Sequence, residues 1–192
     1  MRTGEISLHL IVKDEEPLIG AMLQKLSPFV GEIIVVDTGS TDNTAEIARR
    51  YTRNVFSHPF NHDFSEARNY ALGKATKPWI LQVDVDEQPI PAMLSWIGAY
   101  EPPFNVSGVS FMRHNLVNGE GIGSATTEWH IRLWHRGYTF VGSVHEILAI
   151  PSLRVVRAPE SCFIRHYKTE ARQARQNALY AEWEAKREPN YS

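Results

Sequence analysis

Three carboxylates within four residues are the feature of this sequence that points most directly to chemistry. Asp84, Asp86 and Glu87 follow a short, mostly apolar run at residues 79–83. Such a run, ending abruptly in acids, predicts a buried strand whose carboxyl end opens onto a polar site. Asp84 and Asp86 would share one face of a regular strand and repel each other. A divalent cation prefers oxygen ligands and would relieve that repulsion, so the pattern suggests a metal site.

The same acids have a plainer interpretation. Pro89 and Pro91 follow them, so the carboxylates could instead cap a helix or close a turn. Because two aspartates separated by one residue are common, the rest of the chain has to distinguish the two interpretations.

The first half of the chain alternates strand and helix patterns. The expected strands are residues 6–12, 32–37, 54–57 and 79–84, and the expected helices between them are residues 17–26, 45–51 and 64–74. This alternation predicts a parallel sheet with right-handed crossovers. Asp14 lies just past the first strand, Asp37 lies at the end of the second, and Asp84 and Asp86 lie at the end of the fourth, so these acids should meet at one edge of the sheet. That convergence favours a functional site.

The second half has shorter and more varied elements. Alternating patterns predict strands at residues 108–114, 127–134, 138–141, 144–150 and 161–166, a Gly-rich turn or mobile lid at 118–123, and a polar helix at 170–186. In 127–134, Trp129, Ile131 and Leu133 are expected on one side of the strand, and Glu128, His130 and Arg132 on the other. We therefore expect one domain over 1–192, with a nucleotide-binding half (1–88) and a mixed or antiparallel acceptor-side half (89–192).

The bulk composition excludes several classes of protein. The chain has 192 residues, 43% of them hydrophobic, and a net charge of −2, so it can bury a core and lacks the basic excess of a nucleic-acid-binding protein. Its single cysteine, Cys162, excludes an internal disulfide. The N-terminal apolar run is too short and polar for a signal peptide or membrane span. We expect a cytoplasmic protein, with attachment to a membrane surface through a partner or lipid substrate left open.

Several separated motifs in the right order resemble one family. They occupy residues 13–16, 36–44, 64–69, 84–87, 142–146 and 164–167. Together they are similar to the inverting glycosyltransferases of the GT-A fold, in the large family two, and most of all to the branch that includes lipopolysaccharide-core and peptide glycosyltransferases. The resemblance covers roughly residues 6–186 and implies a nucleotide-sugar donor, usually a uridine diphosphate sugar, with a divalent metal.

The resemblance also implies roles for particular residues. Asp37 and Thr38 would lie near the base and ribose, Arg68 near the base, and Asp84 near the ribose. Residues Val12, Asp14 and Val85 would complete the donor site. Asp86 would bind the metal and His166 would complete its protein ligands. The chain departs from the family at Thr38, where a second acid is frequent, and at Asp14, where the branch usually has asparagine.

Transfer with inversion requires a base and a stabilised leaving group. A metal on the diphosphate stabilises the charge that gathers there, and a histidine ligand favours Mn²⁺ over Mg²⁺. Glu146, in the His-Glu element, is the candidate general base, with Glu87 as the alternative. His145 would orient the base or contact the diphosphate. The acceptor is not readable: a saccharide, a lipid-linked glycan and a peptide all fit, and a nucleic-acid base fits less well.

Three other functions compete with this one. A metal-dependent nucleotidyltransferase would share the sheet, but it usually has a basic, Gly-rich loop where this chain has the acidic residues 14–16. A phosphatase or phosphotransferase would place its acid pair after the first strand. A catalytically inactive nucleotide-sugar-binding homologue would keep the binding residues, and the sequence alone does not separate it from an enzyme.

Overall fold

The protein folds around one curled sheet. The computed structural model describes residues 3–117, 120–121, 127–143, 146–170, 174 and 177–178. The strands are β1 (Ile6–Val12), β2 (Glu32–Asp37), β3 (Val55–Ser57), β4 (Trp79–Gln82), β5 (Glu87–Pro89), β6 (Gly108–Val117), β7 (Glu120–Gly121), β8 (Thr127–His135), β9 (Phe140–Val141), β10 (Ile147–Leu148), β11 (Val155–Arg157) and β12 (Phe163–Lys168). The α-helices are α1 (Glu16–Leu26), α2 (Thr44–Arg49), α3 (Phe64–Leu72) and α4 (Pro91–Ala99).

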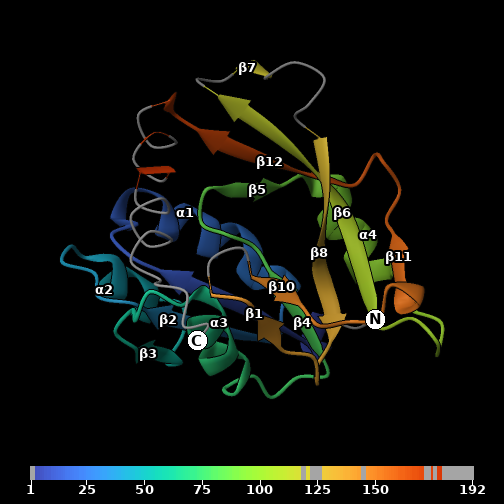
Figure 1. Ribbon diagram of the computed structural model, residues 1–192, viewed down its shortest axis with the longest axis horizontal. Helices are drawn as coiled ribbons and strands as arrows, with labels where there is room; N and C mark the ends of the chain where they lie inside the picture. Colours follow the sequence, from blue (N-terminus) through green and yellow to red (C-terminus); the bar gives the residue numbers. More distant parts are fainter. Residues whose placement is uncertain are drawn as a thin grey trace, which may run out of the picture.

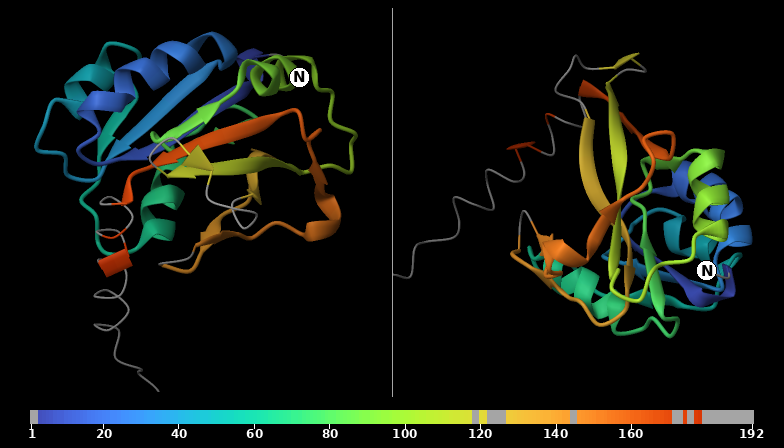
Figure 2. Two further views of the ribbon diagram at one scale, coloured as in Figure 1. Left: turned by 90° about the horizontal axis from the view of Figure 1, so that it is seen from above. Right: turned by 90° about the vertical axis from the view of Figure 1, so that its right-hand side faces the viewer.

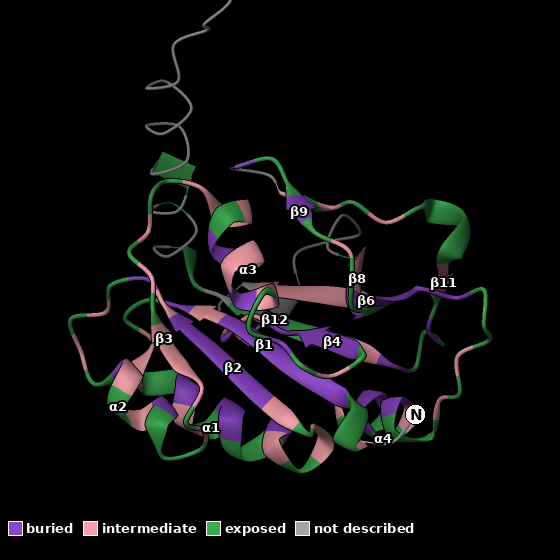
Figure 3. Ribbon diagram, turned by 90° about the horizontal axis from the view of Figure 1, so that it is seen from below, coloured by how far each residue is buried: buried purple, intermediate pink, exposed green. Residues whose placement is uncertain are grey.

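The first half forms the parallel part of the sheet. Strand β1 pairs in parallel with both β2 and β4, and β2 pairs in parallel with β3. Helices α1, α2 and α4 lie on one face of this sheet and α3 lies on the other (Figure 3). Strands β1, β2 and β4 are buried on both faces, as their nearly continuous apolar sequences require. The alternation predicted from the sequence is therefore confirmed.

The second half continues the same sheet in mixed directions. The order along the main path is β3-β2-β1-β4-β8-β6-β12-β5. Strand β8 runs antiparallel to β4 and β6, β12 runs parallel to β6, and β5 runs antiparallel to β12. A separate β9–β10 pair lies on the α3 side (Figure 1). The predicted α/β class, with a mostly parallel first half and a mixed second half, is confirmed.

Two hydrophobic clusters hold the layers together. On the α1 and α4 face, Leu8 and Leu10 of β1 belong to the same buried cluster as Leu23 and Met93. On the α3 face, Ala71 packs in a smaller cluster with buried side chains of β2, β4 and β8. In Figure 2, the helices on the α1 and α4 face form a layer along one side of the sheet. The edge where β1 and β4 end is left for polar residues.

The acidic stretch does not continue as a strand. Strand β4 ends at Gln82, and the Glu87 amide donates to the Asp84 carbonyl at 2.9 Å, which closes a turn. The expectation that residues 79–84 form one strand, with Asp84 and Asp86 on one face of it, is therefore wrong. A turn forms here because the chain has to reverse direction before β5. The Glu87 carboxylate also accepts a hydrogen bond from the Asp84 amide at 3.0 Å, which stabilises the turn.

The predicted alternation along residues 127–134 is broken by a β-bulge. Val109 pairs with Leu133 and the next residue, Ser110, pairs with Ile131, so Arg132 is the extra residue. Leu133 packs in the cluster of the α1 face, whereas Ile131 packs against the cluster of the α3 face. The placement of Ile131 and Leu133 on one side is therefore wrong.

Some predictions fall on undescribed residues. Most of the expected helix at 170–186 and part of the Gly-rich segment at 118–123 lie outside the described residues. Within that segment, β7 pairs antiparallel with the end of β6, as a hairpin would. Among the described residues, no helix is long and apolar enough to cross a membrane.

Candidate active site

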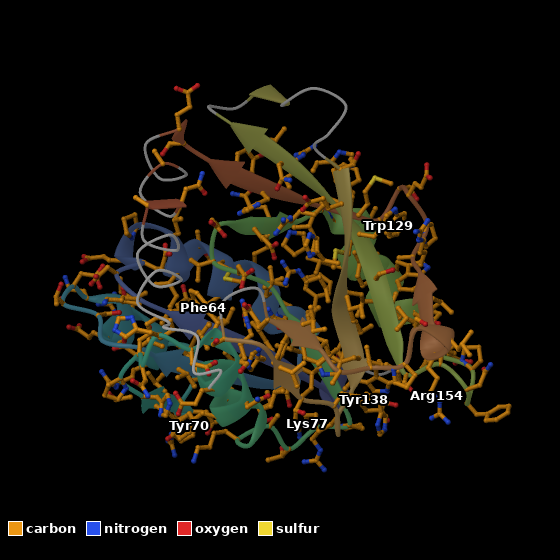
Figure 4. The ribbon with its side chains drawn as sticks, in the orientation of Figure 1. Phe64, Tyr70, Lys77, Trp129, Tyr138 and Arg154 are labelled. Carbon is orange, nitrogen blue, oxygen red and sulfur yellow. The ribbon has the colours of Figure 1, made fainter. Side chains whose placement is uncertain are left out.

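One cavity of about 680 Å³ opens where β1 and β4 end. Its wall is built from both halves of the sheet and from the β9–β10 segment, and the predicted site residues on it are Val12, Thr38, Arg68, Asp84, Val85, Asp86, Glu146 and His166. Aromatic side chains on opposite elements, Phe64 of α3 and Trp129 of β8, also line it (Figure 4). Ligands bind at this edge of open α/β sheets, and the cavity has the size of a small-molecule site.

Asp84 lies between two arginines from different parts of the chain. Its Oδ1 is 3.4 Å from Arg68 Nη2, and its Oδ2 is 3.3 Å from Arg132 Nη2. Burial alone would raise the pKa of Asp84, but the positive charges of Arg68 and Arg132 hold it well below its usual value. Asp84 therefore stays ionised, and its oxygens can accept hydrogen bonds from a ligand.

Arg68 joins the acids of the two halves. Its Nε donates to Glu146 Oε1 at 2.7 Å, while its terminal nitrogens face Asp84. The backbone carbonyl of Arg68 accepts a hydrogen bond from His9 Nε2 at 3.0 Å, and burial lowers the pKa of His9 to about 4. Arg68 is buried on α3. Arg68 is therefore not a solvent-exposed residue of the helix.

Asp86 and His166 are the residues best placed to hold a cation. Asp86 Oδ2 lies 3.3 Å from His166 Nε2, and the Tyr167 amide donates to the Asp86 carbonyl at 3.1 Å. One oxygen and one nitrogen donor suit Mn²⁺ or Mg²⁺ with further oxygen ligands. Within the described part of the chain, no three His, Cys, Asp or Glu side chains form a metal cluster. Asp86 and His166 could therefore supply two of the ligands of such a cation.

Asp14 and Asp37 have local partners and are absent from the cavity wall. Asp37 Oδ1 accepts from the amides of Gly39 and Ser40 at 3.1 and 2.8 Å, which organises the loop after β2. Asp14, with a positive φ of 51°, accepts from the Thr41 amide at 2.7 Å. The bond between Asp14 and Thr41 ties the loop after β1 to the loop after β2. Their predicted contact with a donor stays a prediction.

Thr38 and Glu146 do reach the cavity. The Thr38 hydroxyl donates to the Val12 carbonyl at 3.0 Å, so it also fastens β2 to β1. Glu146 lies just before β10, and its carboxylate meets Arg68 inside the cavity. His145 lies outside the described residues, so its predicted role stays untested. Glu87, the alternative base, is fully buried and does not line the cavity.

Three polar residues of the site were not singled out from the sequence. Arg132 bonds to Glu87 as well as Asp84, and Arg113 Nη1 lies 3.5 Å from Glu87. In the amide orientation that satisfies its neighbours, the Gln82 oxygen accepts from Arg68 at 2.5 Å and from Arg132 at 3.2 Å. Gln82 carried the one usable signal, because a polar residue inside an apolar strand requires buried partners.

A family model that matches most of the chain identifies the family to which the protein belongs. The sequence model described as Glycosyl transferase family 2 matches residues 7–158. The chain belongs to this family. The resemblance inferred from the separated motifs is thereby confirmed.

Individual relatives match the chain in part. Lipopolysaccharide core biosynthesis glycosyltransferase LpsC of Rhizobium meliloti is 29% identical over 87 residues, which cover 43% of this chain and 32% of the relative. Glucosyl-3-phosphoglycerate synthase of Mycolicibacterium paratuberculosis is 30% identical over 176 residues, which cover 83% of this chain and 50% of the relative. The chain thus spans half or less of the length of these relatives.

A solved structure of a similar synthase was also found. Glucosyl-3-phosphoglycerate synthase from Mycobacterium tuberculosis, in complex with Mn²⁺, uridine-diphosphate-glucose and phosphoglyceric acid, is 26% identical. The match covers 57% of this chain and 43% of that chain, with a TM-score of 0.48.

Proposed function

We propose that this family 2 chain is a glycosyltransferase that moves a sugar from a uridine diphosphate sugar to an acceptor nucleophile. The observation that carries the proposal is the convergence of Asp84, Asp86, Arg68, Glu146 and His166 on one cavity at the carboxyl ends of β1 and β4. That convergence combines a charged binding wall, two potential metal ligands and a candidate base. A nucleotidyltransferase would want cationic phosphate-binding groups where this chain places Asp14 and Glu15.

The donor would lie across the cavity from the α3 side to the Asp86 turn. The ionised carboxylate of Asp84 suits hydrogen bonds from ribose hydroxyls, and Thr38 and Arg68 would contact the base. Asp86 and His166 would hold Mn²⁺ or Mg²⁺. When bound, the cation would neutralise charge that develops on the leaving diphosphate. The choice of uridine rests on the resemblance of residues 36–44 and 64–69 to the family.

We propose Glu146 as the general base of an inverting reaction. The acceptor would attack the anomeric carbon from the side opposite the diphosphate, and a carboxylate beside it would take its proton. Among the described residues of 89–192, Glu146 is the carboxylate on the cavity wall, and Arg68 Nε donates to one of its oxygens at 2.7 Å. Its other oxygen is the atom that would receive the proton. Arg68 would then link donor binding to the position of the base.

Donor turnover tests the function without knowledge of the acceptor. The assay measures release of uridine diphosphate from uridine diphosphate glucose with Mn²⁺, for the native chain, Asp86→Asn and the exposed control Glu160→Gln. We expect slow, metal-dependent release that Asp86→Asn abolishes and Glu160→Gln preserves. Binding of uridine diphosphate without release from any nucleotide sugar tested would favour the inactive homologue. Release that persists undiminished in Asp86→Asn would contradict the proposed site.

A further inference from the structure

The imidazole of His166 has a second partner besides Asp86. Its Nδ1 lies 2.8 Å from Oδ1 of Asn115, and its Nε2 lies 3.3 Å from Asp86 Oδ2. His166 is 5% exposed, so its ring nitrogens contact protein groups and have little contact with bulk solvent. The ring is therefore held from two sides, by a carboxylate and by a carboxamide.

The strand pairing explains why these two side chains meet. Strands β6 and β12 are parallel, and Asn115 is the direct register partner of His166. On the other edge of β12, His166 pairs with Glu87, next to Asp86 in the turn. The main chain thus brings Asp86 and His166 together, and the Asn115 side chain contacts the ring from the other side at Nδ1.

The chemistry of the amide decides which nitrogen carries the proton. A carboxamide oxygen only accepts hydrogen bonds, so Nδ1 of His166 must donate to Asn115. In the neutral ring this leaves Nε2 without a hydrogen and directs its lone pair toward Asp86. If the proton lay on Nε2 instead, it would point at the Asp86 carboxylate and occupy the position that a cation needs. Partners of this kind fix the tautomer of metal-binding histidines.

We propose that Asn115 is a positioning residue that keeps the proton of His166 on Nδ1 and presents Nε2, beside Asp86, to a divalent cation. The inference rests on the proposed function for the identity of the cation site. It adds a third residue, from β6, to the pair that the sequence indicated. Asn115 does not line the cavity and so acts through His166 alone.

Two substitutions of Asn115 by residues of similar size distinguish a role in positioning the His166 ring from a role in packing. Asn115→Leu removes the acceptor, whereas Asn115→Asp keeps an oxygen at the same place. We expect Asn115→Leu to weaken Mn²⁺ binding in the presence of uridine diphosphate by about 10- to 100-fold, measured by calorimetry. Asn115→Asp should bind Mn²⁺ at least as tightly as the native chain. The exposed Asn105→Leu serves as the control. Equal losses in both Asn115 variants, or no loss in either, would overturn the proposal.

The tautomer of His166 can be measured in the protein without any metal or nucleotide. Nitrogen-15 NMR of the free protein in mildly alkaline buffer should show a protonated Nδ1 on His166. In Asn115→Leu, Asp86 is the partner that remains, so the proton should move to Nε2. An unprotonated Nδ1 in the native chain, or an unchanged spectrum in the variant, would refute the positioning role. Failure of the native chain to bind uridine diphosphate would count against the proposed function and leave this result decisive on its own.

Discussion

Arg132 shows how a residue can contact two acids of the candidate site and still be missed in the sequence. It is buried, and it bonds to both Asp84 and Glu87. Its position depends on the β-bulge, which shifts the alternation that sequence patterns rely on. By contrast, Asp86, Arg68, Glu146 and His166 could be named in advance because they lie in local motifs. Residues that reach a site through irregular pairing have no such local signal.

Loss of Arg132 should destabilise the protein. Arg132→Met leaves Asp84 with Arg68 as its remaining cationic partner and the buried Glu87 with Arg113 at 3.5 Å. Breaking a buried pair in this way costs about 3–5 kcal/mol of unfolding free energy. Urea denaturation at neutral pH measures the change, and Arg154→Met, at an exposed position, should be close to neutral. A native-like midpoint for Arg132→Met would show that the ion pairs contribute little.

Glu146→Gln tests the general base at the level of one atom. The Gln oxygen can still accept from Arg68 Nε, so the cavity should keep its shape, but the amide cannot take a proton. We expect turnover to fall by roughly 100- to 10,000-fold while affinity for uridine diphosphate stays near the native value. Steady-state kinetics and calorimetry measure the two quantities separately. Full activity in this variant would assign the base to another residue.

His9 should make stability depend on pH. Burial, together with the charge of Arg68, lowers its folded-state pKa from 6.5 to about 4, and Asp84 opposes the shift. The unfolded chain therefore binds the extra proton first as the pH falls, so stability is present above about pH 6.5 and declines toward pH 4.

The size of the His9 effect can be isolated by substitution. Between about pH 7 and about pH 5 the expected loss is on the order of 2 kcal/mol. His9→Gln, which can still donate to the Arg68 carbonyl, should remove that part of the decline. Urea midpoints at both pH values for native, His9→Gln and the exposed His135→Gln provide the comparison. The same decline in native and His9→Gln would mean that His9 is not the group responsible.

At the scale of elements, α3 positions the segment that carries β9, Glu146 and β10. The Asn69 side chain donates to the Phe140 carbonyl at 2.9 Å and accepts from the Phe140 amide at 2.8 Å, as a strand partner would. The Phe64 amide also donates to the Ser143 carbonyl at 2.8 Å. Glu146 lies in the segment held by these bonds. The sequence predicted α3 and the short strands, but their docking depends on long-range contacts that local patterns do not reveal.

Asn69→Leu should loosen this segment without removing any cavity residue. Loss of two partly buried hydrogen bonds is expected to cost about 2 kcal/mol. Amide hydrogen exchange should rise in β9 and β10 while β1 and β2 remain protected, and turnover should fall with Glu146 less firmly placed. The exposed Asn105→Leu is the matched control. Unchanged exchange in β9 and β10 would argue that other contacts hold the segment.

At the scale of the whole molecule, the cavity lies at the seam between the two halves of the sheet. Asp84 and Arg68 come from the first half, and Arg132, Glu146 and His166 come from the second. The parallel half was predictable because its alternating pattern is strong and its connections are regular. The pairings of β4 with β8 and of β5 with β12 were not, since they join residues about 50–80 positions apart. Those pairings complete the site.

The binding of uridine diphosphate, with and without Mn²⁺, tests the central claim most directly. Calorimetry should compare the native chain with Asp86→Ala, and with Glu160→Ala as an exposed control. The site described here predicts binding that strengthens with Mn²⁺ in the native and control chains and loses that dependence in Asp86→Ala. Binding that ignores Mn²⁺ in the native chain, or that keeps its full Mn²⁺ dependence in Asp86→Ala, would contradict a donor site built on Asp86 and His166.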